Sequence, residues 1–251
     1  MNNRQGFATP NSFAILYHAH HTRHPDDLAF FSRLAEQYGG PILELGCGTG
    51  RVALPLSQQG HRVLGLDADV HMLAHFHSFA KLPVFQADMA AFRLAIQFPL
   101  ILLPCNTWST LSATTRQATL ARVKEHLAPN GIFVVSMPNP ILLASLPRRG
   151  APEVEEVFPH PLDGEPVQVS SAWLRGAHFL TFTWHYDYLR ADGVTERVTA
   201  QARHELLSVE GYLAEFAAAG LKMVSLYGDF DESAYTPESS YLISLLSKEN
   251  A

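Results

Sequence analysis

Residues 42–50, ILELGCGTG, place a short apolar run with a single carboxylate directly before three glycines at alternate positions. Glycine adopts backbone conformations that a Cβ atom forbids, so this spacing predicts a sharp turn at the end of a buried strand. A turn without side chains also lets a ligand lie directly against the backbone. The chain is therefore expected to contain a strand, turn and helix unit with a ligand at the carboxyl end of the strand.

Short apolar runs alternate with longer helical segments from residue 41 to about residue 138, as in parallel strands joined by helical crossovers. The fold class predicted is α/β: a doubly wound, mostly parallel seven-stranded sheet whose last strand is antiparallel. Ser208 and Gly220 suit the cap and the stop of the last helix. The expected strands are residues 42–45, 63–67, 84–88, 100–103, 132–137, 223–227 and 241–247, and the expected helices are residues 25–38, 51–59, 70–80, 115–128 and 208–220.

The pattern changes between residues 138 and 207. Prolines recur from residue 138 to residue 166 and break any long helix, and the segments that follow alternate as strands do. This predicts an antiparallel, lid-like β insertion after the fifth strand, at about residues 150–207. We expect a single domain over residues 1–251, with an N-terminal helical segment at residues 10–39.

Charge and cysteine content argue against several classes of partner. The chain has 18 Lys and Arg against 24 Asp and Glu, and no basic run exceeds Arg148-Arg149, so no nucleic-acid partner is expected. The longest apolar run, residues 98–105, is too short to span a membrane, and residues 1–13 lack the pattern of a signal peptide. Cys47 and Cys105 cannot build a disulfide framework. These features predict a soluble protein of the reducing cytoplasm.

Two ligand classes use a glycine turn of this shape. The dinucleotide fingerprint G-x-G-x-x-G requires a small residue at its sixth position, but counting from Gly46 places Arg51 there, where it would obstruct close packing of helix and strand. A nicotinamide-dependent oxidoreductase therefore stays as an alternative that the missing glycine disfavours.

The turn instead resembles motif I of the class I S-adenosylmethionine-dependent methyltransferases, E/D-x-G-x-G-x-G, matched by Glu44, Gly46, Gly48 and Gly50. The resemblance covers about residues 12–247, most closely the small-molecule N-methyltransferases. It implies S-adenosylmethionine as the cofactor, with Glu44 near the ammonium group of its methionine part. The glycine loop, including Cys47, would lie against the methionine and ribose parts.

Two more acidic residues match later markers of this family. Asp67, followed by Ala68, ends the second expected strand, where a carboxylate can accept both hydroxyls of a ribose. Asp88 ends the third expected strand, and the resemblance implies that it binds the exocyclic amine of adenine with Met89 as an apolar contact. The cofactor-binding residues expected are Glu44, Gly46, Cys47, Gly48, Gly50, Asp67, Ala68, Asp88, Met89 and Pro104.

Residues 104–111, PCNTWSTL, lie where this superfamily lines its acceptor site. Members that modify bases carry N/D-P-P-Y/F there, and this chain departs from that signature, which disfavours DNA and protein-glutamine acceptors. We assign Asn106 and Trp108 to the wall of the substrate pocket. The alternative is a capping asparagine and a core tryptophan.

Residues 179–189, FLTFTWHYDYL, alternate so that large apolar side chains share one face and polar side chains the other. Such a face ordinarily packs against another sheet or helix; alternatively, part of it roofs the acceptor site or forms a homodimer contact. Similar N-methyltransferases build a lid from such an insertion, so Tyr186 and His185 are site candidates that cannot both face the same side.

The N-terminal segment, residues 12–24, could fold over the cofactor. Similar methyltransferases carry Tyr-Asp here, whereas this chain has Tyr17-His18, so only the tyrosine is carried over as a catalytic candidate. The histidines at positions 18, 20, 21 and 24 suggest a metal, but no regular ligand spacing with a nearby carboxylate or cysteine accompanies them, so no metal is expected.

His204 could take a proton from an amine or hydroxyl acceptor, and Arg203 could anchor an anionic substrate group; exposed edge-strand residues are the alternative for both. Methyl transfer is an in-line displacement that needs chiefly correct positioning. The sequence therefore predicts a methyltransferase acting on a nitrogen, or as second choice an oxygen, of a small molecule. A non-catalytic module that binds S-adenosylmethionine is a further alternative.

Overall fold

The computed structural model describes residues 10–77 and 82–248 of the 251-residue chain, and its centre is a seven-stranded sheet. The strand order is β10-β11-β5-β4-β1-β2-β3, and only β11 is antiparallel to its neighbours. The predicted α/β fold is thus confirmed. The strands are β1 (Ile42–Leu45), β2 (Val63–Asp67), β3 (Val84–Gln86), β4 (Phe98–Leu103), β5 (Leu127–Pro138), β10 (Leu221–Tyr227) and β11 (Tyr241–Lys248).

Helices cover both faces of this sheet because its central strands are apolar on both sides. One face packs against α5 (Thr107–Thr110), α6 (Ala113–His126) and α8 (Val209–Ala218), and the other against α2 (Leu28–Tyr38), α3 (Ala53–Gln58) and α4 (Val70–His77). Neighbouring residues of β4 separate accordingly, with Ile101 and Leu103 on the first face and Leu100 and Leu102 on the second.

Several element boundaries differ from those expected. The helix expected at residues 115–128 ends at His126, because Leu127 already pairs with Phe98 of β4. The last three residues of the helix expected at residues 70–80 lie outside the described part of the chain. Ser208 caps α8 as predicted, its Oγ accepting a hydrogen bond from the Gly211 N–H at 3.1 Å.

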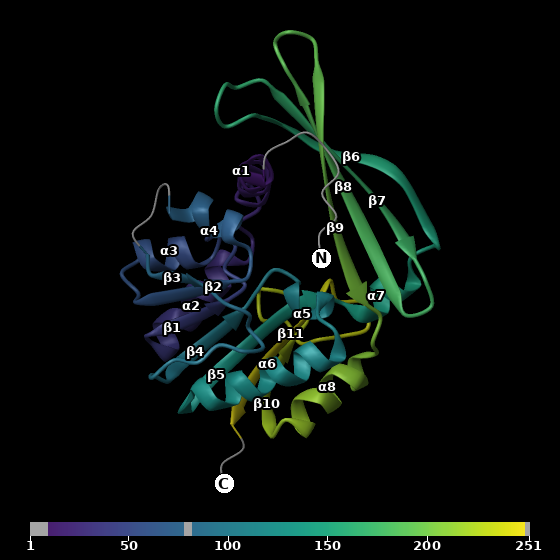
Figure 1. Cartoon of the computed structure of the whole chain (residues 1–251). Coiled ribbons are helices and arrows are strands. Elements are labelled where there is room, and N and C mark those ends of the chain that lie inside the picture. Colours follow the sequence, from purple (N-terminus) through teal and green to yellow (C-terminus); the bar gives the residue numbers. More distant parts are fainter. Residues whose placement is uncertain (1–9, 78–81, 249–251) are drawn as a thin grey trace.

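A second, four-stranded sheet forms the predicted antiparallel insertion. It consists of β6 (Arg149–Pro159), β7 (Pro166–Arg175), β8 (Phe179–Leu189) and β9 (Thr195–Glu205), paired in chain order. The chain enters it from β5 through α7 (Pro140–Ser145). Figure 1 shows this small sheet standing beyond one end of the large sheet, with α1 (Pro10–His21) lying between it and α4.

Helix α1 is held by an apolar cluster of its own. Phe13, Ala14 and Leu16 are buried between Met72 of α4 and residues of the small sheet that include Tyr186. Part of the apolar face of β8 therefore packs against a helix of the same chain. Among the described residues, no helix is both long and apolar enough to cross a lipid bilayer.

The side chain of Arg116 on α6 joins three elements near the base of the small sheet. It is 1% exposed and donates to both carboxylate oxygens of Glu215 on α8, at 2.7 and 2.8 Å. It also donates to Glu205, at the end of β9, at 2.9 Å and to the Leu111 carbonyl at 2.6 Å. These hydrogen bonds fix where β9 leaves the small sheet and where α8 begins.

Replacing Arg116 with alanine is expected to lower the free energy of unfolding by about 2–3 kcal/mol, because hydrogen bonds to charged groups are lost and a large side chain leaves a cavity. Chemical denaturation measures this change. The control is Arg93→Ala, which removes an exposed pair with Glu125 and should leave the midpoint unchanged. Equal midpoints for the two variants would show that the Arg116 cluster contributes nothing to stability.

Candidate functional site

The glycine turn after β1 has the conformation that its sequence predicts. Gly46, Gly48 and Gly50 have φ values of 69°, 54° and 85°, a region that residues with a Cβ rarely adopt. The Gly48 N–H donates a hydrogen bond of 2.8 Å to Oδ2 of Asp67. The turn is thereby fixed to the carboxyl end of β2.

The carboxylate of Asp67 is held by two backbone N–H groups and also lines a cavity. Its Oδ1 accepts from the Asp69 N–H at 2.7 Å, while Oδ2 accepts from Gly48. Each carboxylate oxygen has two lone pairs, so both can accept another hydrogen bond from a ligand. Burial raises the pKa of Asp67, and these backbone N–H groups oppose the rise.

A cavity of about 670 Å³ lies between the carboxyl ends of the parallel strands, α1 and the small sheet. This volume is in the range of small-molecule sites. The turn, the end of β2 and Met89 form one side, whereas α1, β8 and β9 form the others. Of the residues predicted for the site, Tyr17, Gly46, Gly48, Asp67, Ala68, Met89, Asn106, Tyr186, Arg203 and His204 line this cavity.

Helix α1 and β8 supply an aromatic wall. The rings of Tyr17 and His21 lie with their centroids 4.1 Å apart, and those of Phe13 and Tyr186 are roughly perpendicular with their centroids 6.1 Å apart. Trp184 also lines the cavity. Burial lowers the pKa of His21 to about 3 and raises that of Tyr17, so both side chains are neutral at physiological pH.

His204 of β9 stands on the side of the cavity formed with α5. It is 4% exposed, and its Nδ1 lies 2.9 Å from Oγ of Ser109. Burial lowers its pKa to about 4. The adjacent Asn106 has a φ of 63°, a left-handed conformation that turns the chain sharply between β4 and α5. His204 is thus a neutral, hydrogen-bonded side chain and not an exposed edge-strand residue.

Other predicted residues lie outside the cavity lining. Trp108 is fully buried in the core with Phe133 and Phe216, which is the alternative considered for it. His185 is on the opposite face of β8 from Tyr186 and lies 2.9 Å from Oγ1 of Thr199. Alternation along β8 and tight core packing beside α5 account for these positions. Glu44, Cys47, Gly50, Asp88 and Pro104 likewise do not line the cavity.

Glu44 is buried below the turn, on the side of α3. It is 2% exposed, and its Oε2 has no hydrogen-bond partner among the described residues. Burial raises its pKa to about 8, against the opposing effects of the Arg51 charge and the Ala53 N–H. Arg51 itself forms a two-point ion pair with Asp27, at 2.6 and 2.5 Å. The orphaned carboxylate and the bare turn suit a ligand that carries an ammonium group.

Glu44 makes the stability of the protein depend on pH. Because its pKa is raised from an ordinary value of 4.5 to about 8, the folded state keeps a proton that the unfolded chain has lost, and the free energy of unfolding falls across this window as pH rises. Glu44→Gln should remove this pH dependence. The free energy of unfolding of the variant, relative to that of the wild type, should therefore increase from pH 5 to pH 8. Thermal unfolding without cofactor measures it, with exposed Glu36→Gln as the control.

The predictions missed part of the lining. Phe13, His21, Met72, Thr107, Trp184 and Gln201 also face the cavity. Trp184 shares a strand face with Tyr186, and His21 lies one helical turn from Tyr17, so periodicity could have added both. Met72 had no such signal, because its place depends on how α4 packs against α1.

Comparisons with known proteins agree with this geometry. Residues 42–131, from β1 into β5, match the family model of the methyltransferase domain. A candidate methyltransferase of Geobacillus sp. (strain WCH70) is 24% identical over 248 residues, covering 90% of this chain and 94% of that protein.

Solved structures share the fold over almost the whole chain. An S-adenosylmethionine-dependent methyltransferase from Clostridium acetobutylicum superposes with a TM-score of 0.79 at 13% identity, over 96% of this chain and 99% of that one. The sugar N-methyltransferase KedS8 from Streptoalloteichus sp. has a TM-score of 0.74 at 19% identity, over 98% and 94%. Residues 42–131 thus match the methyltransferase-domain model, and the chain as a whole has the fold of solved S-adenosylmethionine-dependent methyltransferases.

Proposed function

We propose that the protein transfers the methyl group of S-adenosylmethionine to a nitrogen of a small molecule. The observation that carries the proposal is a cavity of about 670 Å³, lined on one side by the glycine turn and Asp67 and on the other by aromatic side chains and His204. Cofactor and acceptor would meet between these sides. The resemblance to KedS8, named as a sugar N-methyltransferase, supports nitrogen and makes amino sugars the first acceptors to test.

On the cofactor side, we assign the ammonium group to the carboxylate of Glu44 and the ribose hydroxyls to Asp67. The bare backbone of Gly46 and Gly48 allows close approach, and Met89 offers an apolar contact for the adenine. Asp88 is exposed, and its Oδ1 accepts from the Ala90 N–H at 2.8 Å. An adenine amine could still reach its other oxygen.

Bound S-adenosylmethionine supplies a methyl group on a positively charged sulfonium. The residues of the opposite side orient the acceptor for in-line attack and limit access of water. His21 and His204 add no positive charge beside the sulfonium, because burial holds the pKa values of both below neutrality. The role assigned to this wall is therefore positioning in an environment of low polarity.

Two experiments test the proposal. Calorimetry should show binding of S-adenosylmethionine and of its demethylated product at one site per chain. Incubation with methyl-labelled donor and matched pairs of acceptors, each an amino sugar and its hydroxyl analogue, should then place the label on the amine. Label on the hydroxyl analogue alone would overturn the nitrogen assignment, and label on protein or nucleic acid instead would overturn the small-molecule class.

A further inference from the structure

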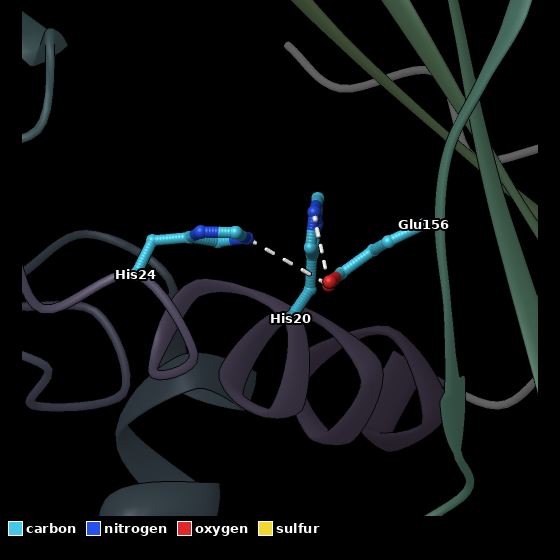
Figure 2. Close-up of side chains that lie close together, drawn as sticks. All are labelled: His20, His24 and Glu156. Carbon is cyan, nitrogen blue, oxygen red and sulfur yellow. Dashed lines mark ion pairs between the residues drawn. The ribbon is translucent and has the colours of Figure 1, made fainter.

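Two histidines near the end of α1 and a glutamate of β6 converge at one point. Nε2 of His20 lies 3.7 Å from Oε1 of Glu156, and Nε2 of His24 lies 3.8 Å from the same oxygen. The three atoms all lie within 4.8 Å of one another. Figure 2 shows His24 pointing at the carboxylate and the ring of His20 standing beside it, while Glu156 reaches over from the small sheet.

The two oxygens of Glu156 have different surroundings. Oε2 accepts a hydrogen bond of 3.4 Å from Nε of Arg23. Oε1 is buried and has no hydrogen-bond partner among the described residues. A buried carboxylate oxygen without a partner is costly, so a cation between it and the two imidazoles would stabilise this arrangement.

The donor set fits one class of ion. Two imidazole nitrogens and one carboxylate oxygen are the protein ligands of zinc sites that keep a further position for water. At metal–ligand distances of about 2.0–2.1 Å, neighbouring tetrahedral ligands lie about 3.3 Å apart. The two histidine–glutamate separations of 3.7 and 3.8 Å are close to this value, and rotation of the histidine side chains would bring the two nitrogens, which lie within 4.8 Å of each other, to the same spacing. We propose that His20 Nε2, His24 Nε2 and Glu156 Oε1 bind Zn²⁺.

The surrounding charge favours a cation. Oε2 of Glu155 lies 3.8 Å from Nε2 of His20 and is placed to act as a fourth ligand or to bind a metal-bound water. Two carboxylates therefore oppose the one positive charge of Arg23. The side chain of Arg23 is 48% exposed, so water and salt screen its repulsion.

The site also connects to the cavity. Nδ1 of His20 lies 3.0 Å from the hydroxyl oxygen of Tyr186, which lines the aromatic wall. With a metal on Nε2, Nδ1 carries the proton and donates it in this hydrogen bond, as is usual for the outer shell of metal-bound histidines. Bound Zn²⁺ would thus tie α1 to β6 and β8 and hold Tyr186 in place.

The direct test uses the full chain without a polyhistidine tag. Zn²⁺ is titrated against a chromophoric chelator, and one equivalent should bind per chain. His24→Gln and Glu156→Gln should each weaken binding by at least about 100-fold, and Tyr186→Phe by about tenfold. The matched controls are Glu153→Gln, exposed on the same strand, and His178→Gln, exposed in the turn that joins β7 and β8; both should retain wild-type affinity.

Two further measurements keep the result decisive if a variant folds poorly. Co²⁺ bound to the wild type should give the intense visible absorption of a four-coordinate site, and Zn²⁺ should displace it. Zn²⁺ should also slow amide exchange in residues 13–24 and 154–158. Weak binding by the wild type, no better than by the ligand variants, or an equal loss in Glu153→Gln, would overturn the site. None of these measurements depends on methyl transfer.

Discussion

Replacing Asp67 with alanine is expected to weaken the binding of S-adenosylmethionine about 100-fold. Hydrogen bonds to a charged acceptor contribute about 1.5–3 kcal/mol each, and two ribose hydroxyls are assigned to this carboxylate. Its hydrogen bonds with Gly48 and Asp69 already hold it at the edge of the cavity. Calorimetry on wild type and variant measures the change.

Asp67 also accepts a hydrogen bond from Gly48, so its removal could weaken cofactor binding by changing the glycine turn. A second measurement must therefore show that the lost affinity comes from the ribose contact. A cofactor analogue without the 2′-hydroxyl provides a double-mutant cycle. The wild type should bind this analogue more weakly than S-adenosylmethionine, whereas Asp67→Ala should scarcely distinguish the two. If the variant still discriminates as the wild type does, the ribose assignment to Asp67 is wrong.

Replacing Gly50 with alanine is expected to lower the free energy of unfolding by about 4 kcal/mol, combining left-handed strain with overpacking. A Cβ at this position would lie 2.0 Å from Cε2 of Phe76, which is fully buried in the core beside α3. The φ of 85° adds strain for any residue other than glycine. Denaturant titration with and without cofactor measures the effect.

Gly60→Ala is the matched control. Its φ is 94°, but nothing lies within 4 Å of an added Cβ, so only the backbone strain of about 1–2 kcal/mol should remain. The difference between the two variants isolates the overlap with Phe76. Equal losses would mean that α4 moves aside freely and that the turn is not confined by core packing.

Some of the features behind these predictions involve residues that are neighbours in the sequence, and others involve residues that meet only when the chain folds. The turn conformation follows from residues next to one another, and the apolar runs of β1, β2 and β4 reflect burial on both faces of a sheet. The number of strands and the parallel direction of most of them likewise follow from the spacing of the apolar runs, whereas the order of the strands came only from the structure. Such local patterns explain why the fold could be predicted.

The lining of the cavity was less accessible to sequence reasoning. Alternation along β8 correctly separated His185 from Tyr186, yet it could not say which face met α1. Trp108, two residues after Asn106, turned into the core instead of the cavity. A short segment after a strand can direct its side chains either way, and only the packing of α5 against β5 and α8 decides.

Sequence by itself determined the parallel sheet, the bare turn at the carboxyl end of β1 and the antiparallel insertion, because glycine conformations and hydrophobic periods act over a few residues. The kind of cofactor followed from the resemblance of this turn to a family motif. Tertiary structure alone decided that Arg51 pairs with Asp27, that Ser109 meets His204, and that Glu156 comes to face His20 and His24. Glu156 is more than 130 positions away from these histidines along the chain, and no local pattern marks such a partner. Contacts of this kind follow only from the folding of α1 against a sheet that the chain forms much later.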